Sequence, residues 1–303
     1  LVQTVEKYLM PYLVIVFAIA AVVIIGKPAD PLAESWHSPG AFWLFLGAVY
    51  GYSAGWNPFA ADYSRYLPKS VDPKAAGRFA ALGLIVAPTI LEIVGILAVR
   101  AGMGSSAPTD DFKSLLGGTL GTLVLLGVVL GSICANVLNV YSGSISFLTM
   151  GIKMKTHYLR AILAVVWGVL GYLVATKYLN DVAKIENFLL VMAYWIGPWL
   201  GVVFADRIRR SGTNISSLLF ARRGNIAGPI AFILSIAVSV YLFSNQVWYT
   251  GYFPKHNPQL GDIAFLVGFA LAFAIYWILF PVGEAHDRAS RKYAGELPPS
   301  SNQ

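Results

Sequence analysis

Eight long runs of apolar residues follow one another along the chain, and short polar loops separate them. Each run has about the length that a helix needs to cross a hydrocarbon core of roughly 30 Å. The pattern therefore predicts an all-α polytopic membrane protein with eight transmembrane helices. These runs lie near 8–26, 42–66, 79–99, 119–150, 158–176, 187–206, 226–245 and 262–282.

The composition agrees with this pattern. Hydrophobic residues make up 57% of the chain, charged residues 12%, and the mean hydropathy is +0.64, whereas a soluble domain carries about 25% charged residues. No soluble domain fits between the apolar runs. We expect one transmembrane domain over 1–295 and a polar, Pro/Ser-rich tail over 296–303 that is disordered and cytoplasmic.

Basic residues predict the orientation of the helices. Of the 22 Lys and Arg residues, sixteen fall on the side of the membrane that holds both termini, and six fall on the other side. Because cytoplasmic loops carry the excess of Lys and Arg, both termini are expected in the cytoplasm. This topology accounts for the net charge of +7 without a nucleic-acid partner.

The second run is interrupted in its middle by Gly55, Trp56, Asn57 and Pro58. Proline lacks an amide hydrogen and disfavours helical geometry in the residue before it. Inside a membrane, such a break is tolerated only against protein or a wet cavity, and transporters place binding sites at breaks of this kind. The break is therefore the first candidate site in the chain.

Two features of the interrupted run bear on that site. Gly47 and Gly51 precede Gly55 at four-residue spacing, which is typical of close helix packing. Gly55 abuts the break, where it allows close approach of a ligand to the backbone. Trp56 lies roughly 20 Å into the run, too deep for the interfacial aromatic belt, and its indole is placed to stack on a planar ligand.

The fourth run carries a polar face. Ser132, Asn136, Asn139 and Gly143 are spaced by 4, 3 and 4 residues, which puts them on one side of a helix. Hydrogen bonds between helices would explain this face. Alternatively, the paired donor and acceptor of an amide match the edge of a neutral, amide-like heterocycle.

Two acidic side chains are candidates for ion coupling or gating. Glu92 falls midway along the third run, and an intramembrane carboxyl is a functional candidate unless it is protonated and bonded to a neighbouring helix. Asp62 follows the break three residues before Arg65, so a local ion pair and a gating or proton-linked carboxyl are both open. Ser132 is a third candidate for this coupling or gating role.

Other chemistry is not indicated. Cys134 is the single cysteine of the chain, and the residues of the runs contain no metal-ligand spacing and no pairing of a nucleophile with a base. The sequence predicts neither an enzyme nor a bound metal or cofactor.

Three segments together resemble the nucleobase–cation symporter family, the purine/cytosine permeases. The segment GYSAGWNPFAADYSRYLP at 51–68 resembles the sixth-helix signature of that family. The segment ANVLNVYS at 135–142 resembles the eighth-helix motif of its cytosine/purine branch, and 194–206 is similar to a tenth-helix pattern.

The resemblance implies a twelve-helix transporter with a leucine-transporter-like inverted repeat. The eight runs would be family helices five to twelve, so the chain would be an N-terminally truncated piece that lacks helices one to four. It also implies that Trp56 stacks on the base, that Asn139 hydrogen-bonds it, and that Asn136 is a neighbour in the same site.

One departure concerns the coupling ion. Sodium-coupled relatives carry a Ser-Thr pair where this chain has Ile133 and Cys134, so protons are favoured over sodium. The expected function is symport of a nucleobase such as cytosine or a purine across the inner (plasma) membrane. The alternatives are a same-fold symporter for hydantoin, allantoin, thiamine or an amino acid, and a membrane sensor that does not transport.

Overall fold

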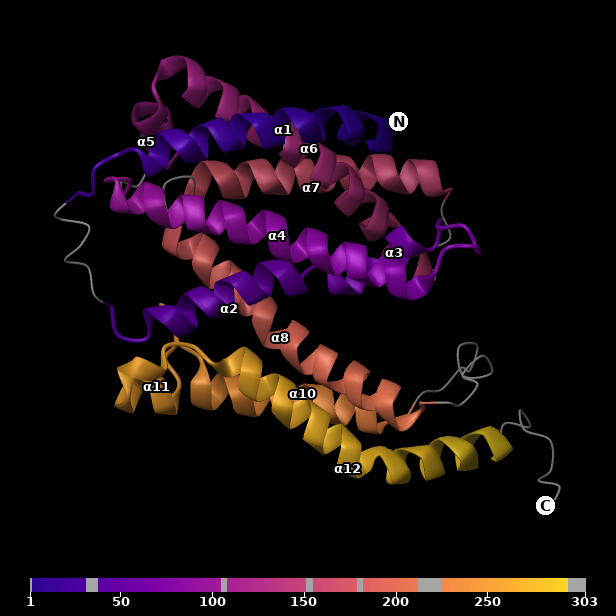
Figure 1. The fold of residues 1–303 in the computed structure, drawn as a ribbon. Coiled ribbons are helices and arrows are strands. Elements are labelled where there is room, and N and C mark those ends of the chain that lie inside the picture. Colours follow the sequence, from indigo (N-terminus) through magenta and orange to yellow (C-terminus); the bar gives the residue numbers. More distant parts are fainter. Residues whose placement is uncertain are drawn as a thin grey trace. The chain divides into compact units, whose positions relative to one another are not determined.

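The computed structural model describes residues 2–30, 38–104, 108–150, 155–178, 182–211 and 225–293. Helices dominate these ranges (Figure 1), and the described residues contain no strand beyond one isolated antiparallel bridge between Asn245 and Thr250. The all-α prediction is confirmed. The expected tail at 296–303 lies outside the described residues.

Six of the eight apolar runs correspond to long helices. Six described helices are long and apolar enough to cross a membrane, and α10 is a shorter apolar helix. The chain is thus a multi-pass membrane protein, while the inverted repeat and the total number of spans stay predictions. The elements are α1 (Val2–Ile25), α2 (Ala41–Ala54), η2 (Asn57–Phe59), α3 (Ala60–Ser64), α4 (Pro73–Arg100), α5 (Pro108–Leu116), α6 (Gly118–Thr149), α7 (Thr156–Tyr178), α8 (Val182–Arg209), α10 (Ala227–Phe243), α11 (Tyr252–His256), η3 (Pro258–Leu260) and α12 (Ala264–Tyr293).

The chain divides into two compact units, and the interrupted run contributes to both. The first unit comprises Leu1–Trp36 and Phe59–Val182, and the second comprises His37–Pro58 and Ala183–Gln303. Helix α2, before the break, therefore belongs to the second unit, and α3, after it, belongs to the first. The predicted break is also a covalent junction between the units.

Local chemistry explains how the chain breaks there. In a continuous helix, the carbonyl of Ala54 would accept a hydrogen bond from the amide of residue 58, but Pro58 has no amide hydrogen. Instead, the side-chain Nδ2 of Asn57 donates to the Ala54 carbonyl oxygen at 3.0 Å. The backbone then tightens into the short 3-10 turn η2 before α3 begins. Asn57 thus satisfies the carbonyl that Pro58 leaves without its helical partner.

Close packing by the two glycines of α2 is confirmed within the second unit. A Cβ atom on Gly51 would lie 2.1 Å from the carbonyl oxygen of Leu189, and one on Gly47 would lie 2.6 Å from the Leu190 side chain. A methyl group at position 51 would overlap the backbone of α8, so a larger residue is excluded there, whereas at position 47 the Leu190 side chain would have to move. The glycines let α2 and α8 approach at the distance of their backbones.

The core of the first unit is formed by α1, α4, α5 and α6. Small and branched apolar side chains interlock there, with Ala20 and Ala98 fully buried. Much of the remaining surface of α4, α6 and α7 is apolar and exposed, as expected of helices whose surroundings are lipid or further protein. This core holds α6, which carries the polar face predicted from the sequence.

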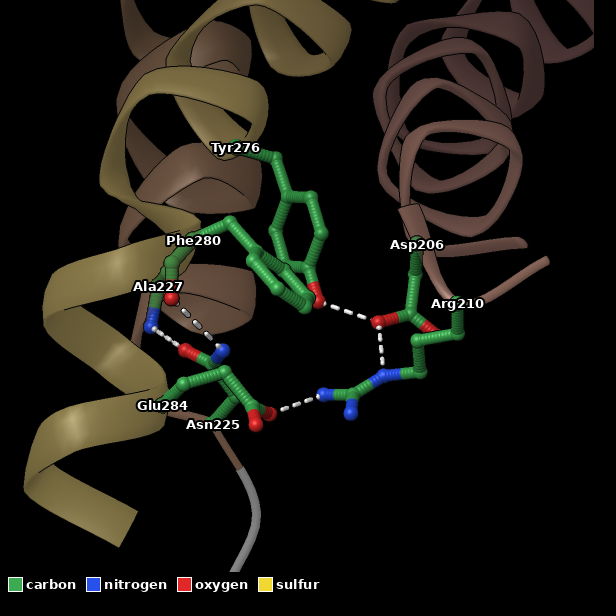
Figure 2. A network of polar contacts seen from close by, with 7 residues as sticks. All are labelled: Asp206, Arg210, Asn225, Ala227, Tyr276, Phe280 and Glu284. Atoms are coloured by element: carbon green, nitrogen blue, oxygen red, sulfur yellow. Dashed lines mark hydrogen bonds and ion pairs between the residues drawn. The ribbon is translucent and has the colours of Figure 1, made fainter. Parts of the chain in front are cut away.

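A charged network joins α8 to α12 in the second unit (Figure 2). The Arg210 guanidinium donates to Asp206 at 2.7 Å and to Glu284 at 2.5 Å, and the Tyr276 hydroxyl also donates to Asp206. Partial burial opposes the charge on the guanidinium, but hydrogen bonds to the two carboxylates outweigh it and raise the pKa of Arg210. Arg210 therefore stays charged and links the end of α8 to the second half of α12.

Asn225 completes the region shown in Figure 2. Its side-chain oxygen accepts a hydrogen bond from the amide of Ala227 at 2.9 Å, in the first turn of α10, and its Nδ2 donates to the Phe280 carbonyl. It thereby fixes the start of α10 against α12.

A second polar network lies near the start of α12, and the Asp262 carboxyl at its centre is fully buried. The Asp262 carboxyl accepts hydrogen bonds from the Asn245 amide at 2.6 Å, from the Ala264 amide at 3.1 Å and from the Tyr194 hydroxyl. Gln246 in turn donates to the Tyr194 hydroxyl at 2.8 Å. One carboxyl thus joins α8, α12 and the chain that follows α10.

Candidate functional site

A cavity of about 770 Å³ lies within the first unit. Its volume falls in the range of small-molecule sites, roughly 300–1,000 Å³. The lining combines aromatic, aliphatic and a few polar side chains, as ligand sites usually do. The lining residues are Asp62, Tyr63, Tyr66, Ile133, Asn136, Val137, Leu138, Val140, Tyr141, Arg160 and Ala164.

Three segments supply this lining. The short helix α3 and the turn after it present Asp62, Tyr63 and Tyr66, because the break at Pro58 starts a new helix there. Helix α6 supplies the residues from Ile133 to Tyr141, and the first turns of α7 supply Arg160 and Ala164. The cavity thus lies between α3, which continues the broken run, and the polar face of α6.

Aromatic and cationic groups meet along one part of the wall. The hydroxyls of Tyr66 and Tyr141 are hydrogen-bonded to each other, and their ring centroids are 6.3 Å apart. The Arg160 guanidinium lies over the Tyr141 ring, 5.0 Å from its centroid. Such a contact contributes about 0.5–1 kcal/mol at an exposed site.

The structure brings two of the residues predicted from the sequence into this cavity. Asn136 and Asp62 both line it, on α6 and α3 respectively. Asn139 is exposed on α6 and is not part of the lining, although its neighbours Leu138 and Val140 are. The Asn136 amide and the Asp62 carboxyl therefore line the same cavity. Asn139 lies three residues after Asn136 on α6.

The other two candidates of this unit lie elsewhere. Ser132 is exposed on α6, and its hydroxyl donates to the Val128 carbonyl of the same helix at 2.8 Å. Glu92 is half-buried on α4, one turn after Pro88. Neither lines the cavity.

Gly55 and Trp56 belong to the second unit and follow directly after α2. The Gly55 amide donates to the Gly51 carbonyl at 3.2 Å and closes the last turn of α2. Trp56 follows at once and is half-buried. The tryptophan therefore sits at the point where the helical backbone is interrupted, as the sequence predicts.

The ion pair between Asp62 and Arg65 that the sequence left open does not form. Among the described residues, no ion pair joins these two side chains. Asp62 faces the cavity instead. The structure thus places the Asp62 carboxyl in the cavity wall, and its role in gating or proton coupling stays a prediction.

Sequence reasoning missed three residues of the wall. Tyr66 and Tyr141 lie inside the two motifs but carry no polar pattern of their own, and Arg160 counts in the sequence only as a topology charge. One spacing does point to the wall: Tyr141 follows Val137 by four residues on α6, so it shares a helix face with another lining residue.

The arrangement is suited to binding a neutral, planar solute. Asn136 offers a donor and an acceptor, Asp62 accepts from N–H groups, and the aromatic rings and aliphatic chains supply apolar contact. In the part of the chain that the structure describes, no group of three His, Cys, Asp or Glu residues gathers as a metal site.

Curated relatives of the chain are purine-cytosine permeases by name. It is 26% identical to the purine-cytosine permease fcyB of Emericella nidulans, over 83% of this chain and 53% of that protein. It is also 26% identical to the putative purine-cytosine permease YxlA of Bacillus subtilis, over 92% and 64% of the two chains. Purine-cytosine permease FCY2 of Saccharomyces cerevisiae matches at 25%, over 80% and 49%.

A family model also matches most of the chain. The chain spans about half to two thirds of the length of these relatives, and no solved structure matches it. Residues 2–268 match the family described as permease for cytosine/purines, uracil, thiamine, allantoin. The resemblance noted in three segments therefore extends over most of the sequence, and the chain belongs to this permease family.

Proposed function

We propose that the chain is part of a secondary transporter that imports a nucleobase, such as cytosine or a purine, by alternating access. The observation that carries this proposal is the cavity beside the broken run, where Asn136 and Asp62 meet aromatic side chains. Membership of the permease family and the names of the relatives support it. A permease function also agrees with the expectation that the chain is not an enzyme.

In this proposal, the base is neutral, so no side chain has to neutralise a charge on it. The Trp56 indole stacks on the ring of the base beside the open backbone at Gly55. Asn139 hydrogen-bonds the edge of the base, and Asn136 is its neighbour in the same site. An amide suits this role because cytosine and purines present adjacent N–H donors and ring-nitrogen or carbonyl acceptors.

The proposed setting is the inner (plasma) membrane with both termini in the cytoplasm. Sixteen of the 22 basic residues then fall on the cytoplasmic side, in agreement with the positive-inside rule. In this orientation, the loops after α3 and before α7 face the cytoplasm.

Asparagine variants test the site assignment. Asn139→Ala and Asn136→Ala should each lower uptake of radiolabelled cytosine or purine about tenfold or more, because each leaves polar groups of the bound base without partners. The measurement is initial uptake in cells, normalised to the amount of intact protein at the surface. Thr122→Ala is the matched control, since its hydroxyl donates to the Gly118 carbonyl within α6 and its loss should change uptake less than twofold. Normal uptake by both asparagine variants would remove them from the site.

The second testable part of the proposed function is the coupling of transport to protons. Ile133 and Cys134 replace the hydroxyl pair of sodium-coupled relatives, so dissipating the pH gradient should collapse accumulation of the base, while replacing sodium by choline should not. Asp62 and Glu92 are the carboxyls proposed to carry the proton. Accumulation that survives the loss of the pH gradient and fails without sodium would contradict proton coupling.

A further inference from the structure

Three of the side chains that line the cavity of the first unit lie together at one end of it. Along α6, the lining runs from Ile133 to Tyr141, and Tyr141 is the member nearest the end of that helix. Along α7, Arg160 lies nearer the start of the helix than Ala164. After α3, Tyr66 is the last lining residue of its segment.

These three residues contact one another, although they come from three different segments. The Tyr66 and Tyr141 hydroxyls are hydrogen-bonded across 75 positions of sequence. The Arg160 guanidinium covers the Tyr141 ring at 5.0 Å. The last lining residue after α3 thus contacts the last one on α6, and the first one on α7 contacts the same residue of α6. These contacts connect all three segments.

The same end of these helices carries the basic loops. Arg65, Lys69 and Arg78 follow α3, and Lys155 precedes α7, so the proposed topology places Tyr66, Tyr141 and Arg160 at the cytoplasmic end. Asn136 lies five residues deeper in α6 than Tyr141, which is about 7.5 Å along the helix axis. A base that moves from Asn136 along the cavity towards the cytoplasm would pass these three side chains.

We propose that Tyr66, Tyr141 and Arg160 form an inner gate that closes the cytoplasmic end of the cavity. The hydrogen bond between the two hydroxyls holds the short helix after the break against α6. Arg160 is a positioning residue, since it holds the Tyr141 ring in place and does not reach Tyr66 itself. Opening the gate breaks the hydrogen bond between these two neutral hydroxyls, and water can replace it at little cost. This inference rests on the proposed function.

Accessibility of a cysteine below the gate tests the proposal. Val137 lines the cavity one turn deeper than Tyr141, so Val137→Cys in a Cys134→Ser background reports on access from the cytoplasm. In inside-out vesicles, a membrane-impermeant maleimide should label it about fivefold faster when Tyr66→Phe or Tyr141→Phe is added, the change expected from losing one hydrogen bond. The double Phe variant should label no faster than either single variant, because both remove the same bond.

Matched variants separate a gate from a merely structural contact. Tyr172→Phe, on an exposed position of α7 away from the cavity, should leave the labelling rate unchanged. Arg160→Ala should speed labelling by about two- to fivefold and raise the KM for external base, since a smaller fraction of the protein is then open to the outside. Arg160→Lys, which keeps a cation over the ring, should restore part of both effects.

Counterflow of labelled cytosine by the unmodified protein in the same vesicles separates the two proposals. If counterflow occurs and both Phe variants label within twofold of the unmodified rate, the gate is wrong and the transport function stands. If the unmodified protein gives no counterflow, the proposed function fails and the gate fails with it.

Discussion

Trp56→Ala is expected to lower nucleobase uptake by about 5- to 150-fold. Stacking of a base on an aromatic side chain contributes about 1–3 kcal/mol, and each 1.4 kcal/mol is a tenfold change in affinity. Trp56 directly follows the last turn of α2 and precedes the turn that Asn57 and Pro58 impose. At this position the indole lies beside backbone that has left the helical pattern.

Two further variants make this result specific. Trp56→Phe keeps an aromatic face of smaller area and should retain part of the uptake. Trp167→Ala removes an indole that is 53% exposed on α7 and does not line the cavity, so uptake should stay within twofold. Uptake is measured with radiolabelled base at a concentration below KM and normalised to surface protein. Equal losses in the Trp56 and Trp167 variants would indicate a general effect of removing tryptophan.

Asp262→Ala is expected to destabilise the protein by about 3 kcal/mol or more. The buried carboxyl accepts from three donors, two of them backbone amides, and each buried donor left without a partner costs about 1–3 kcal/mol. The loss should lower the midpoint of thermal unfolding in detergent by at least about 5 °C. Asp110→Ala, on an exposed position of α5, should leave the midpoint unchanged.

The conservative variant separates hydrogen bonding from charge. Burial raises the pKa of Asp262, although three hydrogen bonds oppose that rise. The folded protein thus holds a proton there more readily than the unfolded chain, and the stability due to Asp262 falls as pH rises through the raised pKa. Relative to Asp262→Asn, the unmodified protein should therefore gain stability as pH is lowered from 7 towards the ordinary aspartate value. A gain in the opposite direction would contradict the raised pKa.

The helices and the break follow from patterns that act within one segment. The apolar runs predict the long helices because lipid demands internal backbone hydrogen bonds, and Pro58 predicts the break because it has no amide hydrogen. Gly47 and Gly51 likewise indicate a close helix contact, though not that Leu189 and Leu190 of α8 are the partners.

Contacts between distant segments could not be predicted in the same way. The hydrogen bond of Tyr66 with Tyr141 and that of Tyr194 with Asp262 join positions 75 and 68 residues apart, and neither pair has a periodic spacing that signals the contact. Asp262 does precede the apolar run of α12 as a helix-capping residue would, but its burial depends on how α8 and α12 pack. The polar face of α6 was predicted, yet only Asn136 of its two asparagines lines the cavity.

The transport proposal is tested most directly by counterflow in proteoliposomes that contain the purified, intact protein. Vesicles preloaded with unlabelled cytosine should take up external radiolabelled cytosine transiently, and external adenine should compete while amino acids should not. Substrate binding without counterflow would instead indicate a sensor that does not transport. Competition by amino acids without competition by adenine would contradict nucleobase recognition.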